Sequence, residues 1–256
     1  SPLFAPVEIG ASLDQLPDNE RRALASIIAA AKIMDAIFLE QVWAGNPSLL
    51  LDLTNDTTAR GQARLSFFLL NKGPWSRLQN NQRFVPGVPP KPAGANYYPP
   101  DTTRDEVEQW LDTLSENERA EATGYFTTIR RNAEGQLVAV PYSVEYQGAL
   151  AIAAAHLREA AQLTSNATLH HYLESRALAF ATNDYYASDV AWMELDSTIE
   201  PTIGPYEVYE DEWFNFKAAF EAFVTIRDDV ETAQLERFSS YLQELEDNLP
   251  IEPELR

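Results

Sequence analysis

Apolar residues recur three and four positions apart from Pro17 to Trp43, a spacing that indicates one face of an α-helix. Asp18 and Glu20 place negative charge at the positive end of the helix dipole. The pattern therefore predicts a helix over 17–43. It stops at Gly45-Asn46-Pro47, and a second, short helix is expected over 49–53.

Between Gly73 and Pro100 the periodicity disappears and proline-containing clusters replace it. Each proline lacks an N–H group and restricts the residue before it, so this segment does not form a regular helix. It is either a subdomain boundary near 73–100 or a long loop wrapped over the surface. The interleaved aromatic residues, among them Phe84 and Tyr97, favour packing onto the parent domain.

After this segment, helical and strand patterns alternate. Thr103-x-x-Glu106 and Ser115-x-x-Glu118 have the spacing of capping boxes, in which side chains bind the free N–H groups of the first helical turn. Two β-rich runs, 125–131 and 136–140, flank a turn that ends in Gly135. This arrangement predicts a β-hairpin.

A long alanine-rich helix is expected over 145–163, and the next helix begins after Asn166, a residue type that can cap it. Residues 202–209 are predicted to form a strand, and a C-terminal helix is expected before Pro250. Together these elements predict an α+β fold: a predominantly helical lobe with a small antiparallel or barrel-like sheet. That sheet should contain 126–129, 136–140 and 202–209.

The net charge of the chain excludes some classes of binding partner. Thirty-nine acidic residues against nineteen basic ones give a formal net charge of −20. Such a field repels phosphate backbones and anionic lipids, so we expect neither a nucleic-acid partner nor a membrane partner. It attracts cations, including the ammonium group of a peptide N-terminus. Ser1-Pro2-Leu3-Phe4 does not resemble a signal peptide. A cytoplasmic location is expected, with a periplasmic or secreted one as the alternative.

Familiar catalytic motifs are missing from the sequence. It contains no cysteine and only three histidines, His156, His170 and His171. A zinc hydrolase usually carries two histidines on one helical face, as in His-Glu-x-x-His, whereas adjacent histidines point about 100° apart on a helix. We therefore predict no zinc site within this chain. Neither a Gly-x-Ser-x-Gly motif nor a phosphate-binding loop occurs, and Gly148 with Arg158-Glu159 lacks the further glutamates of a Nudix box.

One stretch combines acidic and aromatic residues. Its members are Asp189, Glu194, Asp196, Glu200, Glu207, Glu210, Asp211 and Glu212, interleaved with Tyr185, Tyr186, Trp192, Tyr206, Tyr209 and Trp213. Aromatic walls with orienting carboxylates are typical of a cleft for a cationic or peptide-like ligand. Two alternatives remain: an acidic turn whose aromatic residues face the core, and a metal-free carboxylate pair that hydrolyses glycosides.

Within this stretch the sequence resembles a known family. Ile203-Gly204-Pro205-Tyr206-Glu207-Val208-Tyr209, followed by Phe220-Glu221-Ala222-Phe223-Val224, is similar to the segment before the zinc motif of dipeptidyl peptidase III-type metallopeptidases. That family has an Ile-Gly-x-x-Glu-x-Tyr stretch before a Phe-Glu-x-Phe-Val stretch. Weaker likeness extends upstream to Phe84-Val85-Pro86 and downstream to Leu249-Pro250.

The resemblance implies that residues 1–256 are the N-terminal, substrate-binding part of a two-lobed zinc exopeptidase that removes dipeptides from peptide N-termini. It implies that Glu207 helps to hold the substrate's ammonium group and that Tyr209 donates a hydrogen bond near the scissile carbonyl. If both residues lie on one strand, they project to the same face. Zn²⁺ would be bound outside this chain, by a missing C-terminal part of the same protein. That part and an oligopeptide substrate would be the partners.

Three features qualify the resemblance. The family often has Arg where this chain has Glu210, so the neighbouring subsite is expected to differ. The sequence ends at Arg256, before a zinc motif, so we expect a fragment that is inactive alone; the alternative is a metal-free peptide-binding or inhibitory module. Residues 216–226 have helical propensity, whereas the resemblance implies a strand. The β-favouring run Phe223-Val224-Thr225-Ile226 supports the strand.

Overall fold

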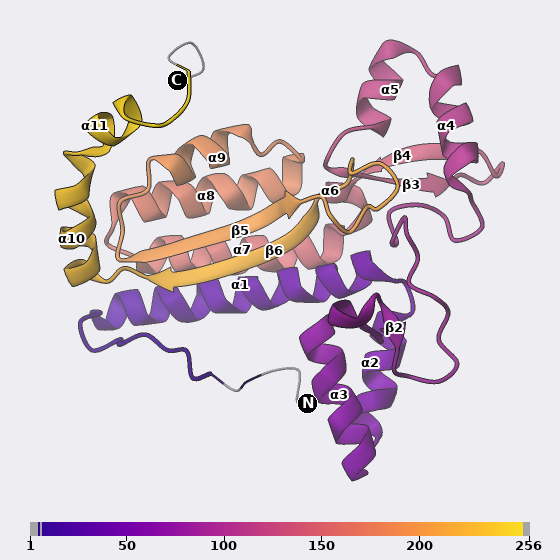
Figure 1. Ribbon diagram of the computed structural model, residues 1–256, viewed down its shortest axis with the longest axis horizontal. Helices are drawn as coiled ribbons and strands as arrows, with labels where there is room; N and C mark the ends of the chain where they lie inside the picture. Colours follow the sequence, from indigo (N-terminus) through magenta and orange to yellow (C-terminus); the bar gives the residue numbers. More distant parts are fainter. Residues whose placement is uncertain (1–4, 6, 253–256) are drawn as a thin grey trace.

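The computed structural model describes Ala5 and residues 7–252, and its fold is α+β and mostly helical (Figure 1). The helices are α1 (Asp18–Val42), α2 (Asn46–Asn55), α3 (Ala59–Asn71), the short 3₁₀ turn η1 (Arg77–Gln79), α4 (Arg104–Thr113), α5 (Glu116–Ala122), α6 (Tyr142–Glu145), α7 (Gln147–Leu163), α8 (Ala167–Thr182), α9 (Tyr186–Met193), α10 (Asp229–Ser239) and α11 (Leu242–Asp247). The strands are β1 (Trp75–Ser76), β2 (Gln82–Arg83), β3 (Thr127–Arg131), β4 (Leu137–Pro141), β5 (Ile199–Glu207) and β6 (Ala219–Ile226).

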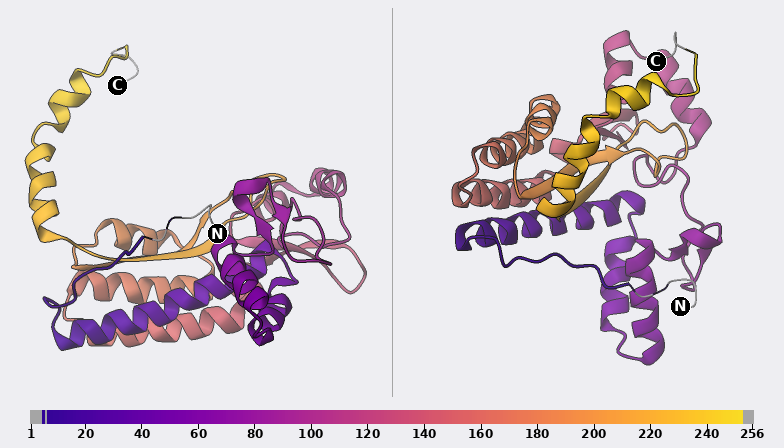
Figure 2. Two further views of the ribbon diagram at one scale, coloured as in Figure 1. Left: turned by 60° about the horizontal axis from the view of Figure 1, so that its bottom comes forward. Right: turned by 60° about the vertical axis from the view of Figure 1, so that its left-hand side comes forward.

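The centre of the molecule is a layer of helices that supports one pair of strands. Helices α1, α7 and α8 lie side by side, and the β5–β6 pair forms a layer on one face of them, in contact with α1 and α8 (Figures 1 and 2). Small residues on α7, such as Ala153 and Ala160, are fully buried and allow α1 to approach closely. Ile27 and Met34 of α1 fill the space between the helices with apolar volume that is removed from water.

The strands of the described residues pair as three separate two-stranded antiparallel sheets, so the prediction of one sheet for all three runs was wrong. The hairpin β3–β4 and the strand β5 were both predicted, but β5 pairs with β6 instead. Ile129 of β3 donates its N–H to the carbonyl of Tyr97 at 2.7 Å, so the loop before α4 occupies the edge that another strand would need. Strand β6 also confirms the strand expected over 216–226.

Several helix ends agree with the sequence, and some do not. Asn166 caps α8 by accepting the N–H of Leu169, and Ser115 with Glu118 forms a complete capping box. At Thr103 only half the box forms, because the carboxylate of Glu106 binds Thr102 and Arg131 instead of returning to the backbone. The helix expected over 145–163 is preceded by a separate short helix, α6, and the C-terminal helix is divided into α10 and α11.

The proline-rich segment 73–100 is mostly irregular and packs against the body of the protein. Tyr97 and Tyr98 are buried in the main core together with residues of α1 and α7. A second, small core, formed by Leu39, Leu53 and Phe68, joins α2 and α3 to the end of α1. The subdomain boundary near 73–100 stays a prediction.

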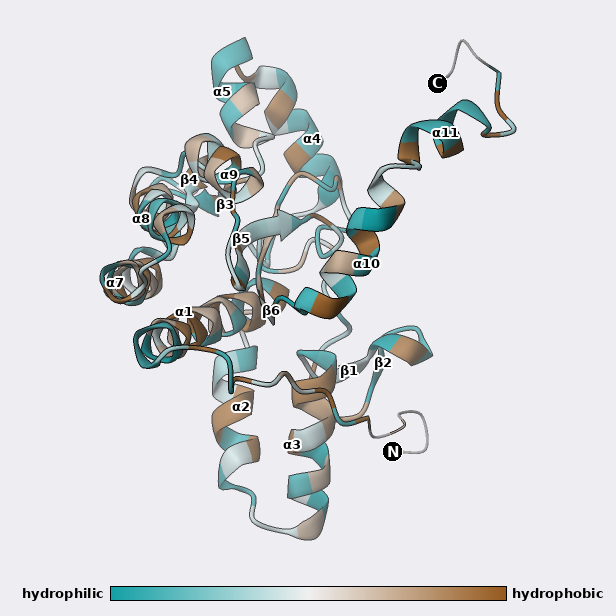
Figure 3. Cartoon of the chain, turned by 90° about the vertical axis from the view of Figure 1, so that its left-hand side faces the viewer, coloured by the Kyte–Doolittle hydropathy of each residue, from teal (hydrophilic) through white to brown (hydrophobic). Residues whose placement is uncertain are grey.

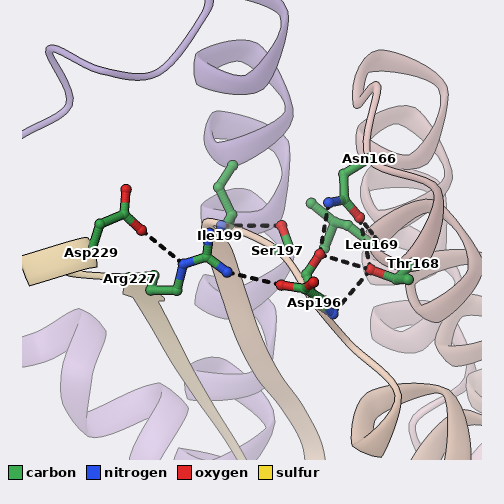
Figure 4. Close-up of polar contacts among 8 residues, drawn as sticks. All are labelled: Asn166, Thr168, Leu169, Asp196, Ser197, Ile199, Arg227 and Asp229. Carbon is green, nitrogen blue, oxygen red and sulfur yellow. Dashed lines mark hydrogen bonds and ion pairs between the residues drawn. The ribbon is translucent and has the colours of Figure 1, made fainter. Parts of the chain in front are cut away.

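Helices α10 and α11 form an arm that projects from the body (Figure 2, left). Arg227 fixes the start of the arm: its Nη1 lies 2.9 Å from Asp196 Oδ1 and its Nε lies 3.0 Å from Asp229 Oδ1 (Figure 4). Helices α10 and α11 carry hydrophobic residues, coloured brown in Figure 3, and the side chains of these residues are exposed. The exposed apolar residues of the arm and of the segment that follows it are Val230, Leu235, Phe238, Tyr241, Leu242, Leu245, Leu249 and Ile251.

Candidate functional site

The β5–β6 ribbon has one face on the helices and one more open face. Ile199, Pro201 and Ile203 of β5 are buried against the helix layer. The alternate residues, such as Thr202 with its partner Phe223, are more exposed, as the two-residue period of a strand requires.

A β-bulge near the end of β5 decides where Glu207 points. Pro205 pairs with Phe220, and Glu207 pairs with the next residue of β6, Ala219, so two residues of β5 oppose one of β6. Without this bulge, Glu207 would follow Ile203 and Pro205 onto the buried face. With it, the side chain of Glu207 is exposed.

Glu207 has a second carboxylate close by. Glu221 of β6 is half-buried, and burial, with the negative charge of Glu207 as the next cause, raises the pKa of Glu221 above its usual value. No ion pair engages either carboxylate within the described residues 7–252. A hollow of about 310 Å³ between α1, Lys72 and β6 reaches Glu221. Exposed Glu207 and half-buried Glu221 therefore concentrate negative charge at this end of the ribbon.

Tyr209 lies beyond the end of β5, so the prediction that the strand reaches Tyr209 was wrong by two residues. It sits in a turn that Asp211 closes by donating its N–H to the carbonyl of Val208 at 3.3 Å. The side chain of Tyr209 is 74% exposed. Glu207 and Tyr209 thus remain near one another and exposed, but through a bulge and a turn rather than through strand alternation.

Most other acids of the acidic and aromatic stretch have structural partners. Asp211 is fully buried and accepts the O–H of Tyr98 at 2.9 Å and the N–H of Phe216 at 2.9 Å. Glu210 is buried beside Arg77 and Lys91, so its side chain turns into the protein and not towards a neighbouring subsite.

The stretch is also spread out in space. Glu200 and Glu207 lie near opposite ends of β5, roughly 23 Å apart at about 3.3 Å per residue. Asp196 binds Arg227 at the far end, beside a larger hollow of about 540 Å³ that Asn166 and Ser197 help to line (Figure 4). The stretch is therefore not one cleft. The carboxylate of Glu207, which is exposed and close to Tyr209 in the sequence, is the one best placed to meet a ligand.

Arg176 of α8 contacts Tyr206 of the strand that carries Glu207, and sequence reasoning missed it. Its side chain is fully buried, and its guanidinium stacks near the rings of Tyr172, Tyr185 and Tyr206, with centroid distances of 5.6, 5.3 and 5.6 Å. Asp189 accepts a hydrogen bond from Nη2 at 2.6 Å. The available signal was a lone arginine placed on the apolar face of α8, between Leu169, Leu173 and Phe180.

Lys217, at the other end of the loop between β5 and β6, was also missed. Its Nζ donates to the carbonyls of Ala122 and Gly124, at 2.6 and 3.0 Å, and to Thr127 Oγ1 at 2.7 Å. Burial lowers the pKa of Lys217 to about 7. Because the ammonium group is enclosed, Lys217 anchors the loop and is not placed to meet a substrate.

Two of the three histidines lie beside other polar groups. His170 Nδ1 lies 2.8 Å from the carbonyl of Ala161, and His156 Nδ1 lies 3.7 Å from Glu159. Over Ala5 and residues 7–252, no three His, Cys, Asp or Glu side chains are grouped so that they could hold a metal ion. Within the same residues, no helix is both long enough and apolar enough to cross a membrane.

Comparisons with known proteins identify the family. Residues 119–255, more than half of the chain, match peptidase family M49. The chain is 40% identical to Nudix hydrolase 3 of Arabidopsis thaliana over 298 aligned residues, which cover 97% of this chain and 39% of that protein. The Nudix-like spacing noted above lies entirely on α7, where Glu159 faces His156 and Arg158 faces Glu174.

Two solved structures share the fold. Dipeptidyl-peptidase III from Corallococcus sp. strain EGB is 62% identical, with a TM-score of 0.92, over 99% of this chain and 47% of that one. DPP III from Caldithrix abyssi is 49% identical, with a TM-score of 0.91, over 98% of this chain and 47% of that one. The chain spans less than half the length of these relatives. It belongs to peptidase family M49.

Proposed function

We propose that this chain is the substrate-binding part of a zinc-dependent exopeptidase that removes dipeptides from peptide N-termini. The observation that carries the proposal is the exposure of Glu207 and Tyr209 together at one end of the β5–β6 ribbon, in a chain of peptidase family M49. The zinc would be held outside this chain, in a C-terminal part that completes the enzyme. That part and an oligopeptide would be the partners.

Glu207 is suited to bind the ammonium group of the substrate. Its carboxylate is exposed, and the neighbouring charge of Glu221 adds to the negative potential at this end of the ribbon. An ammonium group held by a fixed carboxylate sets the distance from the N-terminus to the bond that is cleaved, which is the requirement for releasing dipeptides. An N-acetylated peptide lacks this charge.

Tyr209 is suited to act on the scissile carbonyl. A phenol O–H donates one hydrogen bond, and a donor aimed at a carbonyl oxygen stabilises the negative charge that develops there in the transition state. The exposed side chain of Tyr209 can reach a bound peptide, whereas Tyr97 and Tyr98 are buried.

Two substitutions in the complete enzyme test these roles on a dipeptidyl-arylamide. Glu207→Gln keeps the shape and removes the charge, so KM should rise for substrates with a free N-terminus, while N-acetylated peptides stay poor and unchanged. Tyr209→Phe should lower kcat by roughly 10²–10³ with little change in melting temperature. A near-wild-type kcat for Tyr209→Phe would remove its catalytic role.

The gene itself gives a further test of the proposal. A His-Glu-x-x-(Gly)-His motif encoded within about a hundred residues after Arg256 would supply zinc ligands in a later part of the protein. Peptide binding without hydrolysis by the complete gene product would instead favour a metal-free binding or inhibitory module. Hydrolysis of glycosides would favour the carboxylate alternative.

A further inference from the structure

Tyr209 and Glu210 are neighbours in one tight turn, but one side chain is exposed and the other is buried. Tyr209 is 74% exposed, whereas Glu210 is 6% exposed. The turn closes between Val208 and Asp211. Because the two side chains share one short backbone segment, the position of the Tyr209 ring depends on where Glu210 is fixed.

Two basic residues of the proline-rich segment 73–100 fix Glu210. Arg77 forms an ion pair with Glu210 Oε1, and Lys91 Nζ lies 3.3 Å from Oε2. Arg77 is itself held, since its Nε donates to the carbonyl of Asn71 at 2.8 Å and its backbone N–H donates to Asn71 Oδ1 at 2.9 Å. Lys91 is nearly buried and also binds Glu212 Oε1 at 2.7 Å.

The same segment contacts the turn at further points. The N–H of Glu212 donates to the carbonyl of Ala93 at 2.9 Å, and the O–H of Tyr98 donates to Asp211. Gly94 lies so close to Trp213 that a Cβ atom there would be 2.9 Å from the indole ring. Segment 73–100 therefore contacts each of the residues from Glu210 to Trp213, which immediately follow Tyr209.

Stability alone is a weak explanation for this arrangement. The desolvation of a buried carboxylate offsets much of the Coulomb energy that its ion pairs gain, so the net contribution of such pairs to folding is often small. The two ion pairs provide direction, because Arg77 binds one carboxylate oxygen of Glu210 and the charge of Lys91 lies 3.3 Å from the other. We propose that Glu210, held by Arg77 and Lys91, is a positioning residue that fixes the hydroxyl of Tyr209 for catalysis. The proposal rests on the role proposed for Tyr209.

The test is a double-mutant cycle in the complete enzyme. Glu210→Ala should lower kcat by roughly 10- to 100-fold with little change in KM, the size of effect expected when a catalytic group is misplaced by about 1 Å. In the Tyr209→Phe background, Glu210→Ala should lower kcat no further, because the effect passes through the missing hydroxyl. Glu210→Gln, which keeps an acceptor for Arg77, should lie between the wild type and Glu210→Ala.

The control is Glu108→Ala, which breaks an exposed ion pair with Arg104 far along the sequence and should leave kcat unchanged. If Glu210→Ala does not fold, Lys91→Met removes one partner and carries the same cycle. An additive loss in the Tyr209→Phe background, or a wild-type kcat with only a lower melting temperature, overturns the proposal for Glu210. A near-wild-type kcat for Tyr209→Phe itself overturns both this proposal and the role of Tyr209.

Discussion

Arg176 Nη1 lies 2.8 Å from the position that a Cβ atom on Gly204 would occupy. The backbone of Gly204 also has a φ of +153°, which side-chain-bearing residues rarely adopt. These two facts explain why a glycine is needed at this position of the Ile-Gly-x-x-Glu-x-Tyr stretch: only a residue without a side chain lets β5 pass next to the buried guanidinium of Arg176. Because burial raises the pKa of Tyr185 and Tyr206, the phenols around that guanidinium stay neutral.

Gly204→Ala should therefore lower the free energy of unfolding by roughly 2–3 kcal/mol, through overlap with Arg176 and backbone strain. The measurement is urea unfolding followed by circular dichroism. Gly148→Ala is the matched control, since a Cβ atom on exposed, helical Gly148 meets nothing within 4 Å and should leave stability unchanged or slightly higher. Equal effects of the two substitutions would contradict the contact with Arg176.

Glu207→Gln should lower the pKa of Glu221. Burial is the larger cause of the raised pKa of Glu221 and the charge of Glu207 is the smaller one, so the pKa should fall but stay above its usual value. Carboxyl ¹³C chemical shifts measured against pH report this directly. Glu200→Gln, near the far end of β5, should leave the titration of Glu221 unchanged, and an equal shift in both variants would argue against the proximity of Glu207 and Glu221.

Lys217 should make stability depend on pH in the alkaline range. Its pKa is lowered to about 7 in the folded protein, so between about pH 7 and pH 10 the unfolded chain binds the proton that the folded one releases. The stability of the wild type should rise over this window by at most about 1.4 kcal/mol per pH unit relative to Lys217→Met. Urea unfolding of both proteins from pH 6 to 10 measures the difference, and a difference that does not grow with pH would contradict the shift.

Glu20 should support stability above its own titration range. Burial raises the pKa of Glu20, but hydrogen bonds from Ser165, Thr164 and Asn19 outweigh burial and lower it. Glu20→Gln should therefore cost about 1–3 kcal/mol at pH 7. The contribution of the carboxylate is fully present above pH 4.5 and is lost as the pH falls through the lowered pKa of the folded protein, so the stabilities of the two proteins should converge at low pH in thermal melts.

The control for Glu20 is Glu134→Gln, in the exposed turn between β3 and β4. This substitution should change the melting temperature little at any pH. A Glu20→Gln protein that stays less stable by the same amount at every pH down to acid unfolding would show that shape, rather than charge, makes the contribution.

Local signals in the sequence were sufficient for much of the fold. The spacing of apolar residues placed α1, the turn ending in Gly135 placed the β3–β4 hairpin, and Asn166 marked the start of α8. The resemblance to dipeptidyl peptidase III-type enzymes is confirmed by the match to peptidase family M49, and it also gave the correct strand for β6.

What the sequence could not supply was the pairing of distant residues. The bulge before Glu207 arises from the register in which β5 pairs with β6, and the sequence of β5 alone does not determine that register. Glu210 pairs with Arg77, which lies 133 residues away in the sequence, and no local pattern links the two residues. The expectation that the subsite beside Glu210 differs from that of the family stays a prediction. The roles of Glu207 and Tyr209 stay predictions.

The arm formed by α10 and α11 has a consequence for how this chain behaves in solution. Leu235, Phe238, Leu242 and Leu245 are each more than half exposed, while the net charge of −20 makes copies of the chain repel one another. That repulsion reaches about 10 Å at 0.1 M salt and only about 3 Å at 1 M salt. Ionic strength therefore decides whether the exposed apolar residues of two arms can come into contact. The chain should remain monomeric in low-salt buffer and self-associate at high salt concentration.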